Sequence, residues 1–200
     1  TLPTRPSVIQ PGFRGYQEKT MQLPVQVPMV MMAFNVPTLT TAKDPKTAYS
    51  LSLLADVLDG GLSARLEKRL VREKQLLASV GSGYNAFSRG DGLFLIQATP
   101  RDGVTLAQAK QAIIAEIDAL KTQPIAQSEL TRAKTNTMTS LIYSQDSISG
   151  QAQMISSLNS IGLDDRMVFN LPKILDSITE SDLHAAASKY LVNNNLTVLN

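Results

Sequence analysis

The sequence predicts an α+β fold, with an antiparallel β-sheet covered on one side by helices. Strand-like segments follow one another directly, first within residues 16–36 and again within residues 76–99. Helix-like segments also come in runs, and a last strand-like segment closes the chain. Because strands and helices do not alternate one by one, this order is typical of helices layered on an antiparallel sheet, not of a parallel βαβ repeat.

The N-terminal segment, residues 1–15, is predicted to be an extended linker because its prolines and glycines interrupt any regular pattern. The first strand is predicted over Tyr16–Leu23, where apolar residues alternate loosely. The second, Met29–Val36, is a nearly unbroken apolar run between two prolines, and its length favours a strand buried on both faces. We expect residues 16–200 to form a single domain.

The first two helices lie close together in the sequence. Asp44 and Pro45 suit the N-cap and first position of one helix, and the Gly60–Gly61 pair ends it. Ser63 is the predicted N-cap of the second helix. Its apolar stripe consists of Leu66, Leu70 and Val71. Its cationic residues are predicted on the other faces: Arg65, Lys68, Arg69 and Arg72.

Two further strands, Leu76–Phe87 and Leu93–Thr99, are predicted on either side of a polar turn. A capping box of Thr105 and Gln108 begins the next helix, and Pro124 ends it.

The last third of the sequence is predicted to be mainly helical. Thr179 and Asp182 resemble another cap, and Pro172 is expected to kink or break the helix that contains it. The predicted elements are helices from residue 127, over 148–161, over 164–175 and after Thr179, and a strand at Leu196–Leu199.

Composition excludes several classes of protein. The chain has 200 residues, 43% of them apolar and 18% charged, which is typical of a globular protein and not of a disordered one. The net charge of +2 is too small to imply a nucleic-acid partner. Cysteine is missing, so disulfides and thiolate metal sites are excluded. We expect no membrane span, since no apolar run reaches the required length of about 18 residues.

The residues alone predict no catalytic or metal site. His184 is the one histidine, so a zinc site is not expected, and a solvated or capping role is favoured for it. Residues 60–63 lack the lysine and spacing of a phosphate-binding loop and are better explained as helix caps. The basic run from Arg65 to Lys74 has three interpretations: a solvated helix face, a functional surface, or a nucleic-acid site that the low net charge disfavours.

Four segments in the same order resemble a known family. LLADVLDGGLSARLEKRLVREKQLLASVGSGY, from Leu53 to Tyr84, resembles the GG-x-SRL and LRE stretch of the pitrilysin/insulinase-type zinc metallopeptidases, which include mitochondrial processing peptidase and bacterial zinc proteases. VPMVMMAFNVP, PIAQSELTRAKTNTMTSLIYSQDSISGQA and ITESDLHAAASKYLVNNNLTVL are similar to other family segments. The resemblance covers nearly the whole chain after residue 16, although Ala126 replaces the usual N-cap threonine.

The resemblance implies the metallopeptidase half-clamshell fold (LuxS/metallohydrolase-like). Family members pair two homologous halves, and the first half holds zinc through an HxxEH motif. This sequence has no such motif, so it resembles the second, non-zinc-binding half. In active relatives that half supplies an Arg and, seven residues later, a Tyr that contact the substrate. These positions correspond to Arg72 and Ser79, and Tyr84 is a substitute only if a bulge at Gly81 or Gly83 turns it to the same face.

Two functions follow from the resemblance. The first is the non-catalytic half of a zinc endopeptidase that closes over a peptide substrate, with zinc and its ligands in a partner half on the same chain or a separate subunit. The second is a catalytically inactive structural or interaction domain, which the missing tyrosine favours. The residues do not fix the compartment, and the resemblance favours the bacterial periplasm.

Overall fold

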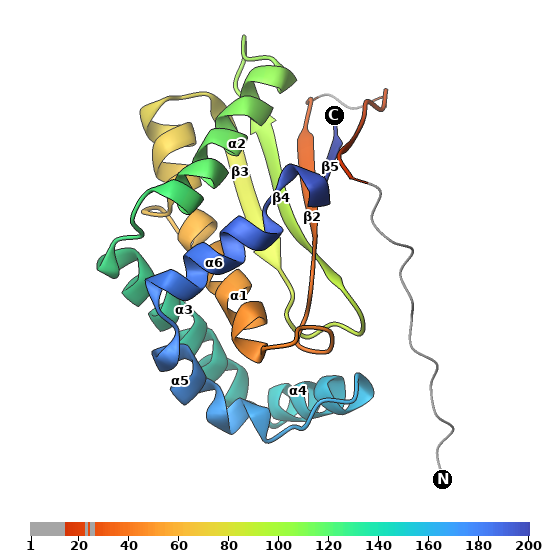
Figure 1. Cartoon of the computed structure of the whole chain (residues 1–200), viewed down its shortest axis with the longest axis vertical. Coiled ribbons are helices and arrows are strands. Elements are labelled where there is room, and N and C mark those ends of the chain that lie inside the picture. Colours follow the sequence, from red (N-terminus) through yellow and green to blue (C-terminus); the bar gives the residue numbers. More distant parts are fainter. Residues whose placement is uncertain (1–14, 23, 25–26) are drawn as a thin grey trace.

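The computed structural model describes residues 15–22, 24 and 27–200. The predicted linker at residues 1–15 lies outside this range except for Gly15. Five strands form one sheet with the order β1-β5-β2-β4-β3 (Figure 1). The strands are β1 (Gln17–Lys19), β2 (Val30–Val36), β3 (Leu77–Tyr84), β4 (Gly92–Pro100) and β5 (Leu196–Leu199).

The sheet is antiparallel except at one edge. β2 pairs antiparallel with both β4 and β5, and β3 pairs antiparallel with β4, whereas the short strand β1 lies parallel to β5. The predicted antiparallel sheet is therefore present, with one parallel pair at this edge that the sequence did not indicate. The reason is topological, because β1 and β5 come from the two ends of the described chain and are not joined by a hairpin.

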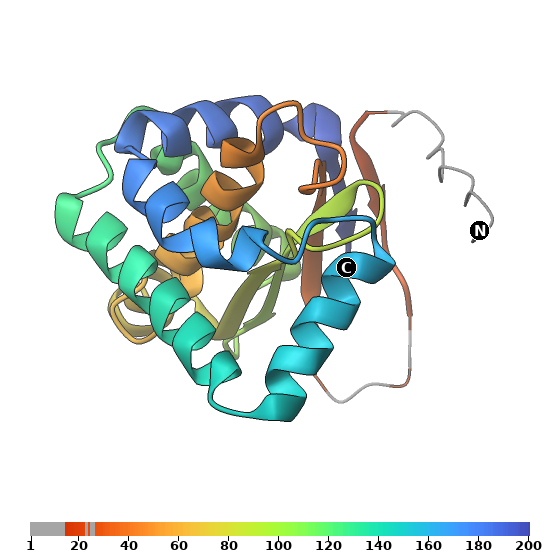
Figure 2. The same cartoon turned by 90° about the horizontal axis from the view of Figure 1, so that it is seen from below.

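Six α-helices account for most of the other described residues, and α1, α2 and α6 pack against β-strands on one face of the sheet (Figures 1 and 2). This confirms the predicted layering. α3 packs against α1, and α4 and α5 lie beyond the end of the sheet at which β2 ends (Figure 1). The helices are α1 (Pro45–Asp59), α2 (Leu106–Thr122), α3 (Gln127–Gln145), α4 (Ile148–Ser160), α5 (Met167–Ser177) and α6 (Glu180–Tyr190).

The burial of β2 alternates along the strand. Val30, Met32 and Phe34 are buried against the helices, whereas Met31 and Ala33 on the opposite face are only half-buried. The expectation of a strand buried on both faces is therefore wrong, and period-two alternation explains why. The sheet thus has one face inside the core and one accessible face.

Side-chain caps begin three helices as the sequence predicts. The Asp44 carboxylate accepts from the Lys46 N–H at 2.9 Å to begin α1. The side chains of Thr105 and Thr179 accept in the same way at α2 and α6, with Gln108 and Asp182 completing the two capping boxes. These caps satisfy backbone donors that have no partner within the helix.

One local prediction is wrong and one is wrong in part. Residues Glu67–Glu73 form a π-helix, η1, without a side-chain N-cap, so Ser63 does not cap a regular α-helix. Of the kink or break expected at Pro172, the break does not occur, because α5 continues through Pro172 to Ser177. A proline removes only one helical hydrogen bond, to Val168 here, and packing of the buried Leu171 and Leu175 holds the rest. A short 3₁₀ turn, η2 (Asn193–Asn195), precedes β5.

Within the described residues, no helix is both long and apolar enough to cross a membrane.

Candidate functional site: a cationic hollow beside Arg72

The π-helix η1 fixes the position of Arg72. The Lys74 N–H donates to the Arg69 carbonyl at 2.9 Å, five residues back, and the Leu76 N–H donates to the Leu70 carbonyl at 2.9 Å. Gln75 follows with a φ of +52°, a left-handed conformation that costs most non-glycine residues energy. π-helical turns are rare and are frequent at functional sites. The wide turn places Arg72 at the surface, immediately before β3 begins.

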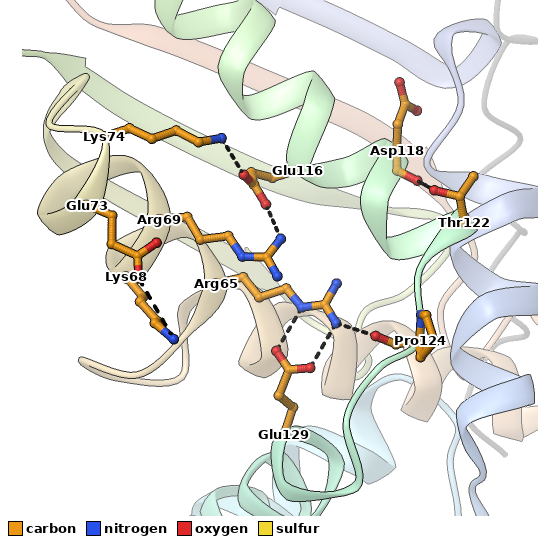
Figure 3. A network of polar contacts seen from close by, with 10 residues as sticks. All are labelled: Arg65, Lys68, Arg69, Glu73, Lys74, Glu116, Asp118, Thr122, Pro124 and Glu129. Carbon is orange, nitrogen blue, oxygen red and sulfur yellow. Dashed lines mark hydrogen bonds and ion pairs between the residues drawn. The ribbon is translucent and has the colours of Figure 1, made fainter.

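Glu116 of α2 anchors the inner side of η1. Its side chain is 5% exposed, and it accepts from Arg69 Nη1 at 2.8 Å and from Lys74 Nζ at 3.1 Å (Figure 3). A buried carboxylate is stable only when charged donors compensate its lost hydration. The two cations therefore serve mainly to hold η1 against α2.

Arg65 and Glu129 form a second, more buried anchor (Figure 3). Arg65 is 3% exposed and donates to both Glu129 oxygens at 2.8 Å, and to the Pro124 carbonyl at 3.0 Å. Burial alone would raise the pKa of the Glu129 carboxyl, but the Arg65 guanidinium and the Ala126 N–H lower it below its ordinary value. Glu129 thus caps α3 in place of a side chain at Ala126, which has no acceptor.

The prediction that Arg65 lies on an outer face of its helix is therefore wrong. Arg65, which lies just before η1, donates to both carboxylate oxygens of Glu129 at the start of α3 (Figure 3). This placement also disagrees with a continuous basic surface over Arg65–Lys74, since Arg65 and Arg69 are directed at carboxylates.

Two arginine side chains hold the loop between α1 and η1 by donating hydrogen bonds to its carbonyl oxygens. Arg72 Nη2 donates to the Leu62 carbonyl at 2.6 Å, and Arg132 Nη1 donates to the Ser63 carbonyl at 3.3 Å. The Gly60 N–H donates back to the Asp56 carbonyl at 2.6 Å, which ends α1 as predicted. The loop therefore serves as a helix end and as a support for two guanidinium groups.

These side chains surround a hollow of about 510 Å³, which we call the cationic hollow. Its lining residues come from the α1–η1 loop, η1 and the start of α3. They are Ser63, Arg65, Lys68, Arg69, Arg72, Pro124, Ala126, Ser128, Glu129 and Arg132. Five of them are cationic and one, Glu129, is acidic, so the hollow is strongly positive.

Ser79 and Tyr84 lie on opposite faces of β3. The bulge in this strand falls between Leu77 and Ser79, and the pairing is regular from Ser79 to Tyr84. Ser79 is exposed on the accessible face, whereas Tyr84 stacks on buried Phe94 with ring centroids 6.3 Å apart. The Tyr84 hydroxyl donates to the Pro37 carbonyl at 2.7 Å, and burial raises its pKa. Neither Gly81 nor Gly83 carries a bulge, so Tyr84 does not share the face of Ser79, as alternation predicts.

The three predicted site residues do not share one hollow. Arg72 lines the cationic hollow, whereas Ser79 lines a separate one of about 310 Å³ with Gln97 and Thr99. Among the described residues, no three His, Cys, Asp or Glu side chains are placed to hold a metal ion. His184 pairs with Glu180 of its own helix at 3.2 Å.

The family model for the peptidase M16 inactive domain matches residues 2–137. This chain belongs to that family. The match includes the α1–η1 loop, η1 and the start of α3, which together form the cationic hollow. No curated protein sequence matches the chain.

Solved structures with the same fold extend the M16 comparison beyond residue 137. A protease from Helicobacter pylori is 22% identical with a TM-score of 0.84, and the alignment covers 94% of this chain and 45% of that one. A candidate zinc protease from Bordetella pertussis Tohama I is 25% identical with a TM-score of 0.75, covering 88% of this chain and 93% of that one. The chain therefore spans less than half of the Helicobacter protein.

A third similar structure is complex III2 from Candida albicans, with 16% identity and a TM-score of 0.75. The alignment covers 92% of this chain and 45% of that one. At this identity the likeness concerns the fold alone.

Sequence reasoning missed Arg132 and the Arg65–Glu129 pair. The family-like segments that contain Arg65 and Glu129 were both recognised, but their contact joins positions 64 residues apart. The position of Arg65 beside the apolar Leu66 could have suggested that Arg65 is buried. It could not have indicated which carboxylate pairs with Arg65.

Proposed function

We propose that this M16 inactive domain is the non-catalytic half of a zinc endopeptidase. In this proposal residues 16–200 act as one domain that closes over a peptide held at the zinc site of a partner half. Arg72 donates hydrogen bonds to backbone carbonyls of that peptide. A guanidinium suits this role because its charged N–H groups form strong hydrogen bonds in fixed directions.

The observation that carries the proposal is the difference between Arg72 and two nearby arginines. Arg65, just before η1, and Arg69 are directed at carboxylates, whereas Arg72 donates to the Leu62 carbonyl. Arg72 is also exposed at the rim of the cationic hollow. Its remaining N–H groups are therefore available to a ligand.

Ser79 and Tyr84 have different places in the proposal. Ser79 lies on the accessible face of β3, where a side chain meets a peptide only if the partner half covers that face. Its short hydroxyl makes it a weaker contact than the tyrosine of active relatives. Tyr84 supports the sheet through Pro37 and Phe94.

The test is to compare the zinc-bearing half with and without this chain, using a quenched fluorescent peptide and metal analysis of each part. We expect the zinc-bearing half to need this chain for turnover, and we expect zinc to stay with that half. Equal turnover without this chain would contradict the proposal, and so would stoichiometric zinc in this chain alone.

A structural or interaction domain is the second candidate function. The serine at position 79 favours it, because the tyrosine expected of active relatives is missing. The same measurement separates the two functions. A structural domain predicts that a complex with another protein forms normally and that neither the complex nor its parts hydrolyse peptide.

A further inference from the structure

The cationic hollow contains more positive charge than its own acidic residue balances. Both oxygens of Glu129 accept from Arg65, and one also accepts from the Ala126 N–H. Arg69 and Lys74 are directed at Glu116, which is not among the lining residues. Lys68 and Arg72 therefore remain as cations of the hollow without a close buried carboxylate. Arg132 lies near the carboxylates of Glu129 and Asp56, which already accept from Arg65 and Thr137.

Lys68 has only a weak ion pair. Its Nζ lies 3.9 Å from Glu73 Oε1, and both side chains are more than half exposed. An exposed pair at this distance contributes little, because water screens it and both side chains lose conformational freedom. Lys68 can therefore turn toward an anion in the hollow at little cost.

Arg65 and Arg132 carry N–H donors that the surrounding protein does not use. Nη1 of Arg65 and both Nε and Nη2 of Arg132 are buried and have no hydrogen-bond partner in the described part of the chain. Asp56 lies near Arg132, but its carboxylate accepts from Thr137 Oγ1 at 3.0 Å. Buried polar atoms are nearly always paired in folded proteins, so these donors add positive charge to the wall of the hollow that no group beside them balances, which favours an anionic occupant.

The geometry favours a carboxylate attached to a peptide. Arg132 is held at the hollow by its bond to the Ser63 carbonyl, next in the loop to the Leu62 carbonyl that holds Arg72 at the rim. A planar carboxylate can accept two parallel N–H bonds from a guanidinium group. The volume of about 510 Å³ suits a side chain and not merely a small ion.

We propose that the cationic hollow is a subsite for an acidic side chain, Asp or Glu, of the peptide substrate. This inference rests on the proposed function, because Arg72 at the rim is the group that brings a peptide backbone to the hollow. Arg132 and Lys68 neutralise the carboxylate, while Arg65 and Glu129 keep the wall rigid. The subsite would give this half of the enzyme a part in substrate selection.

The test uses the assembled two-half protein with zinc removed by a chelator, so that peptides bind without cleavage. The probes are fluorescent decapeptides with a single Glu moved through an alanine–serine background, each matched by a Gln version. At the position that reaches the hollow, we expect Glu to bind about tenfold more tightly than Gln at low salt, as charge-assisted hydrogen bonds require. This preference should fall as salt is raised.

Substitutions in the hollow show which side chains cause the preference for the Glu peptide over the Gln peptide. Lys68→Gln should reduce the Glu-over-Gln preference about threefold, a typical effect for one partly exposed charge. Arg132→Gln combined with Lys68→Gln should abolish it. Lys68 is 56% exposed, so its variant is expected to fold even if the double variant does not. Lys173→Gln, which removes an exposed cation of α5 outside the hollow, is the matched control and should leave the preference unchanged.

The outcomes separate this inference from the proposed function. Arg72→Gln should weaken Glu and Gln peptides by the same factor, because it acts on the backbone. If Arg72→Gln does so but Glu and Gln peptides bind equally at every position, the subsite is contradicted and the proposed function stands. A Glu preference that survives in Lys68→Gln and in the double variant also contradicts the subsite. If neither peptide binds, both proposals are wrong.

Discussion

The inner and outer sides of the helical segment 65–73, which includes the π-helix η1, carry cationic residues with different consequences. On the inner side, Arg65 and Arg69 are directed at the carboxylates of Glu129 and Glu116. On the outer side, Lys68 and Arg72 are exposed and have weak or backbone partners. Lys68 and Arg72 each lie three residues after an arginine that pairs with a buried carboxylate, yet neither reaches such a carboxylate itself.

This comparison shows why a basic segment cannot be interpreted from its charge alone. Removing an inner cation leaves a buried carboxylate without compensation, so the change should appear in stability. Removing an outer cation leaves only solvated groups behind, so the change should appear in ligand binding.

The largest effect is expected for Arg65→Ala. The substitution leaves Glu129 and the Pro124 carbonyl without their donors, and loss of one partner of a buried ion pair destabilises a protein by about 3–5 kcal/mol. Urea unfolding followed by circular dichroism measures the change. In the double variant Arg65→Met with Glu129→Gln, the buried charge is gone as well, so the loss should be clearly smaller. Equal losses in both variants would show that the charge is unimportant here.

Glu116→Ala should destabilise the protein by about 1–3 kcal/mol, the usual cost of removing a buried acceptor of charged donors. The effect should be smaller than that of Arg65→Ala, because Arg69 and Lys74 are 33% and 53% exposed and can turn to solvent. The same unfolding experiment applies, with Asp118→Ala on an exposed position of α2 as the control. A larger loss for Glu116→Ala than for Arg65→Ala would reverse the proposed order.

Acidification should weaken the inner anchor specifically. The folded-state pKa of Glu129 lies below its ordinary value, so its ionised form stabilises the protein above the unfolded-state pKa of about 4.3, and that stability is lost as pH falls through the lower folded-state value. We compare unfolding free energies of the wild type and Glu129→Gln between pH 7 and pH 3. Their difference should be constant near neutral pH and shrink on acidification. A constant difference throughout would contradict the assignment.

Ala126→Thr should stabilise the protein by about 1 kcal/mol, because it supplies the missing N-cap acceptor of α3. Ala126 has the extended ψ of 142° that an N-cap requires and is exposed, so the larger side chain has room. Thermal unfolding of Ala126→Thr and Ala126→Val separates the hydroxyl from the added bulk. Equal effects of the two substitutions would exclude capping as the reason.

Local sequence patterns predict the layered fold and its helix caps. They do not predict the contacts between segments that are far apart in the sequence. The caps at Asp44, Thr105 and Thr179 depend on residues within one turn, so their spacing was sufficient. The parallel pairing of β1 with β5 joins the two ends of the described chain, and no local pattern encodes it.

The candidate site shows the same limit. Arg72 came from a family resemblance, and the structure adds its setting on a π-helix, which no periodicity had indicated. Arg132 was missed because its role depends on a loop about 70 residues away, whose Ser63 carbonyl it contacts. Alternation along β3, by contrast, placed Tyr84 opposite Ser79 unless a bulge intervened, and the structure has no bulge between them.

The most direct test of the account is the turnover of the assembled protein with Arg72→Ala, measured together with its unfolding free energy. We expect a loss of stability below about 0.5 kcal/mol, as for surface substitutions, and a loss of kcat/KM of about 100-fold, as for a misplaced substrate. Arg166→Ala, which removes an arginine that is 80% exposed near α5, is the matched control and should change neither quantity by much. A kcat/KM for Arg72→Ala equal to that of Arg166→Ala would contradict the role of the outer side of η1 in substrate binding.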